Sequence, residues 1–265
     1  MDIPVKRWFD AIPQRRSRRN YTGQTLPPHI RQQISEFIES WNGIVGGARI
    51  VFVPQNPDKV FKGAVGSYGK IKNAPAYAAF IGDMSHPNVQ ENTGYLGEGF
   101  ILEMTALGMA TCWVGGMFDP KVVEEHIRLE ATEKVLSVTP IGYATKDYSF
   151  QEKLMAGLAS GQKRKELEDL CLTPGTGTCP PWVKSALKAA QLSPSAVNRQ
   201  PWRFSVEDQA IQISVDNGKD TYHIAKRLDC GIAMLHLEVG AMFKGMKGSW
   251  KSVKSPDVAR FEVMP

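Results

Sequence analysis

The sequence has no hydrophobic run long enough to cross a bilayer, and only four of its 265 residues are cysteine. We therefore expect no membrane segment. The cysteines are far apart and form no CxxC pair, and the five histidines form no HExxH motif, so neither a disulfide framework nor a metal site is expected. Residues 1–6 lack the basic and apolar pattern of a signal peptide, and we expect a cytoplasmic location.

Two familiar nucleotide-binding motifs are also absent. The sequence contains no GxGxxG, the glycine fingerprint of a resident dinucleotide. Residues 62–70 are rich in glycine and end in Lys70, but Ile71 follows where a phosphate-binding loop needs Ser or Thr to hold magnesium. A flexible loop is therefore the ordinary interpretation of this segment.

Charge is moderate and mostly dispersed. Charged residues make up 22% of the chain and hydrophobic residues 42%, which is typical of a globular protein with a sizeable core. The net charge of +5 could suit nucleic acid, but the basic residues cluster only at 15–19 and 163–165. Two short clusters suit a small anion better than a duplex, so we rank a nucleic-acid module far behind and expect no nucleic-acid partner.

The spacing of apolar residues alternates between helical and extended patterns. Prolines precede several of the helical patterns, where a proline fits the first turn. We expect helices at 5–12, 30–41, 94–109, 120–126 and 163–170, and strands at 48–53, 76–81 and 135–144.

The second part of the chain repeats the first. Pro180 and Pro181 open an apolar pattern like the one that follows Pro27 and Pro28. Gly94, Gly108, Met109 and Trp113 recur, with the same order and spacing, as Gly231, Gly245, Met246 and Trp250. Chance can produce some of these identities, but their order predicts one domain over 1–265, with halves at about 1–150 and 178–265 around a pseudo-twofold axis. Residues 151–177, rich in Gly, Ser, Lys and Thr, would connect the halves.

Three segments carry the residues of a binding site. Arg15–Arg19 contains four guanidinium groups that repel one another unless an anion lies among them, although a solvated basic turn is the commoner case. Gly115 and Gly116 leave backbone amides open to a ligand, although glycine also simply ends helices. Residues 193–202, SPSAVNRQPW, predict a polar turn of small residues and amides that a flat ligand could approach.

The string from Pro194 to Trp202 resembles the PSxxNxQPW signature of the FMN-dependent nitroreductase family, and Arg15–Arg19 resembles its RRSxR segment. Family members are usually homodimers with FMN at the subunit interface. Here the motifs lie in different halves of one chain, which is similar to the single-chain, TM-type members. The resemblance implies an α+β, nitroreductase-like fold whose two halves mimic the homodimer, and a monomer with one complete FMN site and one degenerate site.

The resemblance also implies site residues, with no catalytic side chain. Arg15, Arg16, Ser17 and Arg19 would hold the phosphate, ribityl chain and pyrimidine of FMN, with Arg19 near flavin N1 and O2. Lys163, Arg164 and Lys165 match the basic segment that completes the phosphate site, and which of the three reaches the phosphate stays open. Gly115 and Gly116 match the turn whose amides face flavin N5. The remaining expected cofactor contacts are Trp113 and Val114 beside that turn, Pro194, Ser195 and Asn198 from the other half, and Lys70 near the pyrimidine.

For function, the resemblance implies an NAD(P)H-dependent flavin oxidoreductase. NAD(P)H would pass hydride to flavin N5 and leave, and a small electron acceptor such as a nitroaromatic or quinone would take its place, by ping-pong kinetics. The missing GxGxxG agrees with a nicotinamide that visits. Flavin fragmentation, dehalogenation and azoline oxidation also occur on this fold, and a non-catalytic FMN store or sensor is the alternative from another class.

Overall fold

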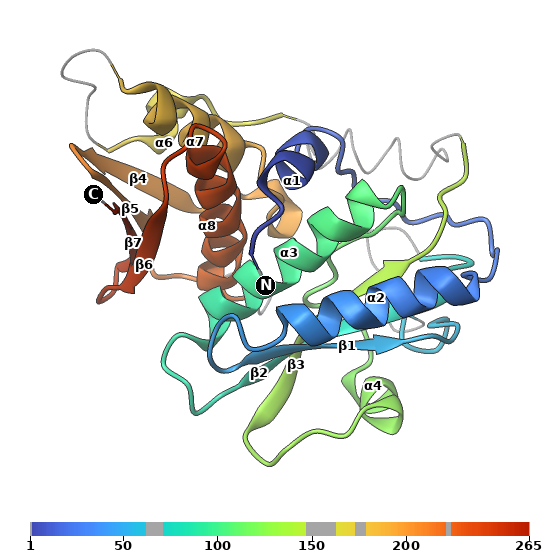
Figure 1. Ribbon diagram of the computed structural model, residues 1–265. Helices are drawn as coiled ribbons and strands as arrows, with labels where there is room; N and C mark the ends of the chain where they lie inside the picture. The colour runs from blue at the N-terminus through green and yellow to red at the C-terminus, as the bar shows by residue number, and fades with distance from the viewer. Residues whose placement is uncertain (1, 62–70, 147–162, 173–178, 221–223, 265) are drawn as a thin grey trace.

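Two long helices, α3 (Val89–Ala106) and α8 (Lys226–Met242), pack against each other at the centre of the molecule, with an antiparallel sheet on either side (Figure 1). The computed structural model describes residues 2–61, 71–146, 163–172, 179–220 and 224–264. Helices packed on antiparallel sheets confirm the predicted α+β class. Within these ranges, no helix combines the length and the apolar content needed to cross a membrane.

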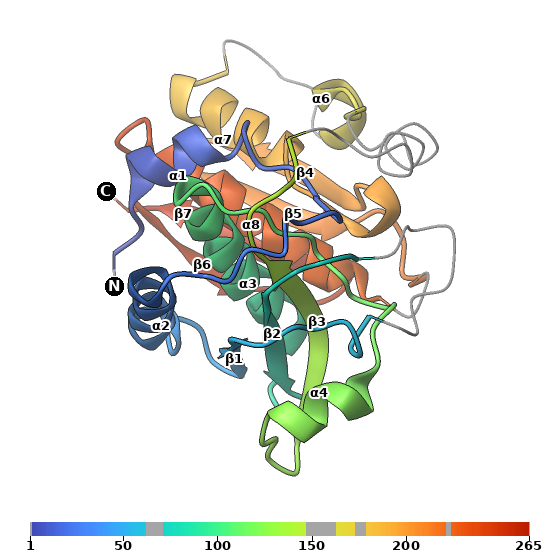
Figure 2. The same cartoon turned by 90° about the vertical axis from the view of Figure 1, so that its right-hand side faces the viewer.

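The first sheet contains, in spatial order, β1 (Ala48–Val53), β2 (Ala76–Asp83) and β3 (Glu133–Ile141), all antiparallel. The helices of this half besides α3 are α1 (Val5–Ala11), α2 (Pro28–Trp41) and α4 (Pro120–His126). Ala78 and Phe80 of β2 pack in the core that contains α3, whereas Tyr77 and Ile81 pack with Val123 of α4. Successive strand residues face opposite sides, so α3 and α4 cover opposite faces of the sheet (Figure 2).

The second half places α6 (Leu167–Leu170) and α7 (Pro181–Gln191) before its sheet, whose spatial order is β4 (Trp202–Glu207), β5 (Ala210–Val215), β7 (Asp257–Val263) and β6 (Gly248–Ser252). Like the first half, it runs helix, two paired strands, long helix, and a strand that pairs with the second of the two. Each middle strand also carries one irregularity in register, after Phe80 in β2 and after Ile213 in β5.

The two central helices approach most closely at two glycines. A Cβ on Gly94 would lie 2.0 Å from the carbonyl oxygen of Leu228, and a Cβ on Gly231 would lie 2.0 Å from that of Glu91. Only glycine lets the two backbones come this close. The contact is reciprocal, because each glycine meets the residue three positions before the other glycine.

Most predicted elements are present, and the differences have local causes. The strand at 48–53 and the helix at 120–126 have the predicted bounds, whereas the helix expected at 94–109 begins earlier, at Val89, and ends at Ala106. The helix expected at 163–170 is confined to Leu167–Leu170. The N–H of Lys165 donates to the side-chain oxygen of Gln200 at 2.9 Å, so this stretch bonds to another part of the chain instead of continuing the helix.

Candidate functional site

The polar turn predicted at 193–202 has a strained backbone. Ala196–Asn198 forms a single 3-10 turn, and φ is positive at Val197 (47°), Asn198 (57°) and Gln200 (47°). A β-branched valine is a genuine outlier in this left-handed region. The N–H of Gln200 donates to Ser195 Oγ at 2.9 Å, which closes the turn on itself. Strained backbone of this kind persists only where surrounding contacts hold it, and such contacts cluster at functional sites.

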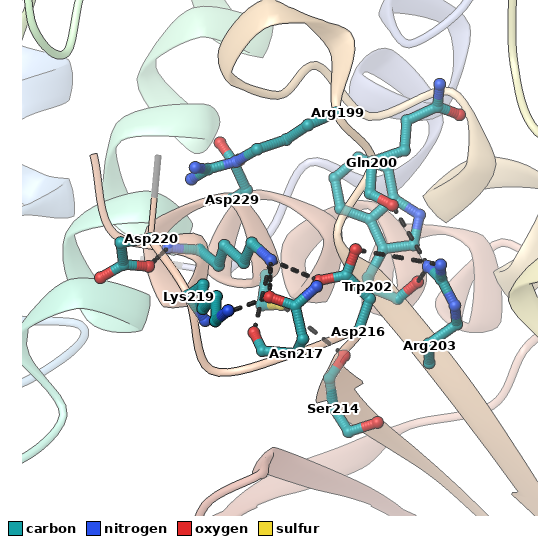
Figure 3. Close-up of polar contacts among 12 residues, drawn as sticks. Arg199, Gln200, Trp202, Arg203, Ser214, Asp216, Asn217, Lys219, Asp220 and Asp229 are labelled. Atoms are coloured by element: carbon teal, nitrogen blue, oxygen red, sulfur yellow. Dashed lines mark hydrogen bonds and ion pairs between the residues drawn. The ribbon is translucent and has the colours of Figure 1, made fainter. Parts of the chain in front are cut away.

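A buried ion pair holds the turn against the first turn of α8. Asp229 accepts from the N–H of Ala196 at 3.1 Å and from Arg199 Nε at 2.7 Å. Arg199 also donates to the carbonyl oxygen of Ile224 at 3.0 Å. Burial raises the pKa of Asp229 to about 6, against the opposing pull of Arg199 and the Ala196 N–H. Figure 3 shows Arg199 beside Asp229.

The side-chain amides of the turn bind the basic connector segment. Asn198 Oδ1 accepts from Arg164 at 2.9 Å, and Asn198 Nδ2 donates to the carbonyl oxygen of Lys163 at 2.9 Å. Gln200 also donates to the Lys163 carbonyl, at 3.2 Å. Lys165 donates through Nζ to the carbonyl oxygens of Arg199 and Gln200 at 3.1 and 3.2 Å. The Asn198 amide therefore orients Lys163 and Arg164, a role that sequence reasoning did not assign to it.

Arg164 brings the early basic segment and the late turn together. The pKa of Arg164 is lowered to about 10, mainly because the side chain is buried and also because the positive charges of Arg15 and Arg16 are nearby. Arg15 is only 7% exposed, so two of these three cations have lost much of their water. Cations held together out of water repel strongly unless an anion joins them. The three guanidinium groups are the donor set that a phosphate selects.

The early basic segment, residues 15–19, is hydrogen-bonded to Thr111, four residues before Gly115 and Gly116, which we call the glycine turn. Ser17 forms a parallel β-bridge with Thr111, and the N–H of Arg18 donates to the Thr111 carbonyl at 2.9 Å. Arg15 Nη1 lies 3.5 Å from Ser17 Oγ. The carbonyl of Arg19 accepts from the N–H of Lys72 at 2.9 Å. These backbone bonds hold Ser17 and Arg18 against Thr111, two residues before Trp113, and Arg19 against Lys72.

The glycine turn connects to the second half through one side chain. Val114 is bridged to Val138 by a pair of 2.9 Å hydrogen bonds, and the chain then turns at Gly115 and Gly116, the second of which is exposed. A Cβ on Gly115 would lie 3.3 Å from the side chain of Ile224, whose carbonyl is the acceptor for Arg199. The glycine turn and the late polar turn therefore meet at Ile224.

A buried polar network under the glycine turn was not predicted. Trp113 Nε1 donates to Glu98 Oε2 at 2.7 Å, and Glu98 Oε1 lies 2.8 Å from His236 Nε2. The other ring nitrogen of His236 lies 3.1 Å from the Ala189 carbonyl, which can only accept, so this nitrogen carries a proton. Glu98 and His236 are fully buried on α3 and α8. No sequence motif marks them, because only the packing of the two helices makes them partners.

The structure brings expected site residues from all three segments and from the connector into one region. Contacts or charge interactions connect Arg15, Arg16, Ser17, Gly115, Arg164, Ser195 and Asn198 through Thr111, Ile224 and Arg199. Pro194 is buried at the start of the late turn, and Lys163 is exposed. Lys70 and the glycine-rich segment before it lie outside the described residues. Sequence reasoning missed Arg199 within its own signature and Asp229, which no motif marks.

Comparisons with known proteins identify a family whose sequence model matches this chain. The sequence model of the family described as "Putative TM nitroreductase" matches residues 8–241. A "putative nitroreductase" from Thermotoga maritima has a similar crystal structure, with a TM-score of 0.62, 20% identity, and coverage of 97% of this chain and 94% of that one. A nitroreductase family protein from Clostridium difficile 630 has a TM-score of 0.47 and 18% identity, over 64% of this chain and 98% of that one. A comparison with curated proteins gives no match.

Proposed function

The chain belongs to the family described as "Putative TM nitroreductase", and on that premise we propose that it is an FMN-dependent oxidoreductase. The chain has a nitroreductase-like fold, which it shares with the Thermotoga maritima structure. In the proposed reaction, NAD(P)H is the reductant and a small oxidised molecule, such as a nitroaromatic or a quinone, is the acceptor. The two would occupy the same place in turn, which is ping-pong kinetics.

The single observation that carries this proposal is the convergence of Arg15, Arg16 and Arg164. Arg15 is buried, Arg164 is partly buried and Arg16 is exposed, and guanidinium groups in this arrangement fit the phosphate of FMN, which would add charge-assisted hydrogen bonds to them. Among the three basic residues of the connector, Arg164 is the one that feels Arg15 and Arg16. Lys165 donates to the carbonyls of Arg199 and Gln200, and Arg164 donates to Asn198 and to the Leu192 carbonyl. We assign the phosphate contact to Arg164 because the charges of Arg15 and Arg16 act on it.

The turns on both sides would frame the flavin ring. The exposed Gly116 and its neighbour Gly115 offer backbone N–H groups without a Cβ to keep a ligand away, and we assign them to the flavin N5 edge. Arg19 would place a cation near N1 and O2, where negative charge develops on reduction. Trp113, Val114, Pro194 and Ser195 would complete the walls. When bound, FMN would supply the hydride chemistry, which no side chain of this site can provide.

The two halves would act as the two subunits of a homodimer fused into one chain. Support comes from their shared order of elements and from the reciprocal contacts of Gly94 and Gly231. An isologous interface has this property, since residue i of one copy meets residue j of the other and the reverse. The phosphate cluster takes Arg15 and Arg16 from the first half and Arg164 from the connector, which Asn198 of the second half orients.

Purification followed by anaerobic reduction tests the proposal. The protein should be yellow, release FMN on denaturation, and lose its flavin absorbance on mixing with NADH or NADPH in a stopped-flow instrument. A nitroaromatic or quinone should restore the absorbance. Bound FMN that neither nicotinamide bleaches would instead indicate a store or sensor. A colourless protein with no affinity for added FMN contradicts the proposal altogether.

A further inference from the structure

Resting on the proposed function, we propose that the Arg199–Asp229 ion pair is the positioning element of the phosphate site, and sets its affinity from behind the late turn. The pair joins the late turn to the first turn of α8. It acts through the turn, whose Asn198 holds Arg164 in place. Neither Arg199 nor Asp229 has to touch the cofactor for this role.

The first step is the strain in the turn. Three residues of the segment, Val197, Asn198 and Gln200, have positive φ, a conformation that asparagine tolerates but that is strained for valine and glutamine. The Asp229 carboxylate accepts from the Ala196 N–H, just before the strained residues, and from the Arg199 guanidinium, which lies among them. Asp229 is 2% exposed, so its hydrogen bonds compete little with water.

The second step is the path from the turn to the anion. Asn198 uses its oxygen to accept from Arg164 and its amide nitrogen to donate to Lys163, at 2.9 Å each. If the turn relaxed, Asn198 would lose this geometry, and Arg164 would move away from Arg15 and Arg16, which repel it. A relaxed turn therefore means a looser and weaker anion site.

The third step is that protonation of Asp229 should have the same effect as its removal. The charged and titratable groups that bear on Asp229 are Arg199 from the turn, Asp220 from the segment before α8, and Cys230 on the helix. Glu91 of α3 is paired with Arg227 at 2.6 Å. Arg199 is thus the cation that pairs with the Asp229 carboxylate. Below about pH 6, where Asp229 takes up a proton, FMN binding should weaken.

Folding stability should change in the opposite direction, which separates positioning from a purely structural role. The pKa of Asp229 is raised in the folded state, so its contribution to stability is full below its ordinary pKa near 4 and is lost as pH rises through about 6. A merely structural pair would tie binding to stability. Here the protein should gain stability and lose FMN affinity as the carboxylate is protonated.

The experiment measures the dissociation constant of FMN by fluorescence quenching between pH 5 and 8 for the apoprotein and four variants. Asp229→Asn and Arg199→Gln should each weaken binding roughly tenfold near pH 7.5, the size of one charge-assisted hydrogen bond. Arg199→Lys should restore part of the loss. Glu91→Gln is the matched control, since it breaks another buried ion pair of α8 that does not touch the turn, and it should bind FMN like the wild type.

The pH series isolates Asp229 from the cofactor. The phosphate monoester of FMN takes up its own second proton near pH 6, so the FMN affinity of the wild type and of every variant should depend on pH in this range. Wild type and Glu91→Gln should show an additional fall in affinity that Asp229→Asn lacks. If Asp229→Asn and Arg199→Gln both bind as tightly as Glu91→Gln at every pH, the inference is wrong while the proposed function stands. If the wild type itself does not bind FMN, the proposed function fails and this inference fails with it.

Discussion

Arg164 donates to Asn198 at 2.9 Å and lies within electrostatic reach of Arg15 and Arg16. Its pKa is lowered to about 10, first because burial removes water and then because the neighbouring charges are of the same sign. An arginine at pH 7 stays protonated even so, and the phosphate of the proposed FMN would add a charge-assisted partner to the Asn198 and Leu192 oxygens that Arg164 already contacts.

Replacing Arg164 with Ala should weaken FMN binding by about 1 to 3 kcal/mol, because a charge-assisted contact to phosphate is lost. Calorimetric titration of the apoprotein measures this. Lys163→Ala should weaken binding less, since Lys163 is exposed and its carbonyl, which Asn198 uses, is kept. Lys188→Ala, an exposed lysine of α7, controls for net charge. Equal losses in Arg164→Ala and Lys163→Ala would contradict the assignment of the phosphate contact.

At the scale of elements, the pair formed by α3 and α8 supports both sheets and the site. Glycines set how close the helices come, and buried polar groups set how they are aligned. Glu98 of α3 joins Trp113 to His236 of α8, and on the same interface Tyr95 of α3 and Trp250 both donate to Glu238 of α8 at 2.8 Å. In each case an indole of one half and a side chain of the other share one carboxyl group, so a shift of one helix would break both sets of bonds.

Gly94→Ala should destabilise the protein by about 1 to 3 kcal/mol, because its Cβ would lie 2.0 Å from the Leu228 carbonyl and the backbones must separate. In a helix with free space the same change would stabilise by about 1 kcal/mol, so the sign of the effect is the test. Gly231→Ala should cost a similar amount. Gly218→Ala, where a Cβ has nothing within 4 Å, should stay within about 0.5 kcal/mol in urea unfolding.

At the scale of the molecule, the two halves share their order of elements but not their chemistry. In the first half, no sequence like the polar turn of residues 193–202 follows Trp41. Instead, the Asn42 side chain accepts from the N–H of Ile50 at 2.8 Å and donates to its carbonyl at 3.0 Å, where α2 ends. The segment before Pro180 has no counterpart of the RRSxR sequence. If the two halves are related by a pseudo-twofold axis as we propose, a second anion site related by that axis would therefore lack both its cations and its turn.

Titration of the apoprotein should accordingly reach saturation at one FMN per chain, and light scattering should give the mass of one chain, 29.3 kDa. Flavin fluorescence at protein concentrations well above the dissociation constant gives the stoichiometry directly. Two FMN per chain would contradict the degenerate second site. One FMN per two chains would contradict the fused dimer.

The sequence alone predicted most elements of the first half, and it predicted the kind of ligand. Helical spacing and Pro28 predict α2, whose Ile34, Phe37 and Trp41 are buried, and the early arginines and late polar turn indicate an anion and a flat ligand. These features are local, because periodicity, proline geometry and clustered charge act within a few residues of the chain.

Only the tertiary structure decided which residues meet. Arg164 was one of three equivalent basic residues until Asn198 and the two early arginines singled it out. Asp229 and His236 had no signal at all, since a carboxylate or an imidazole acquires its role from the partners that packing brings to it. The physical reason is burial: removing water is what turns these ordinary side chains into strong and specific partners, and burial is a property of the folded chain as a whole.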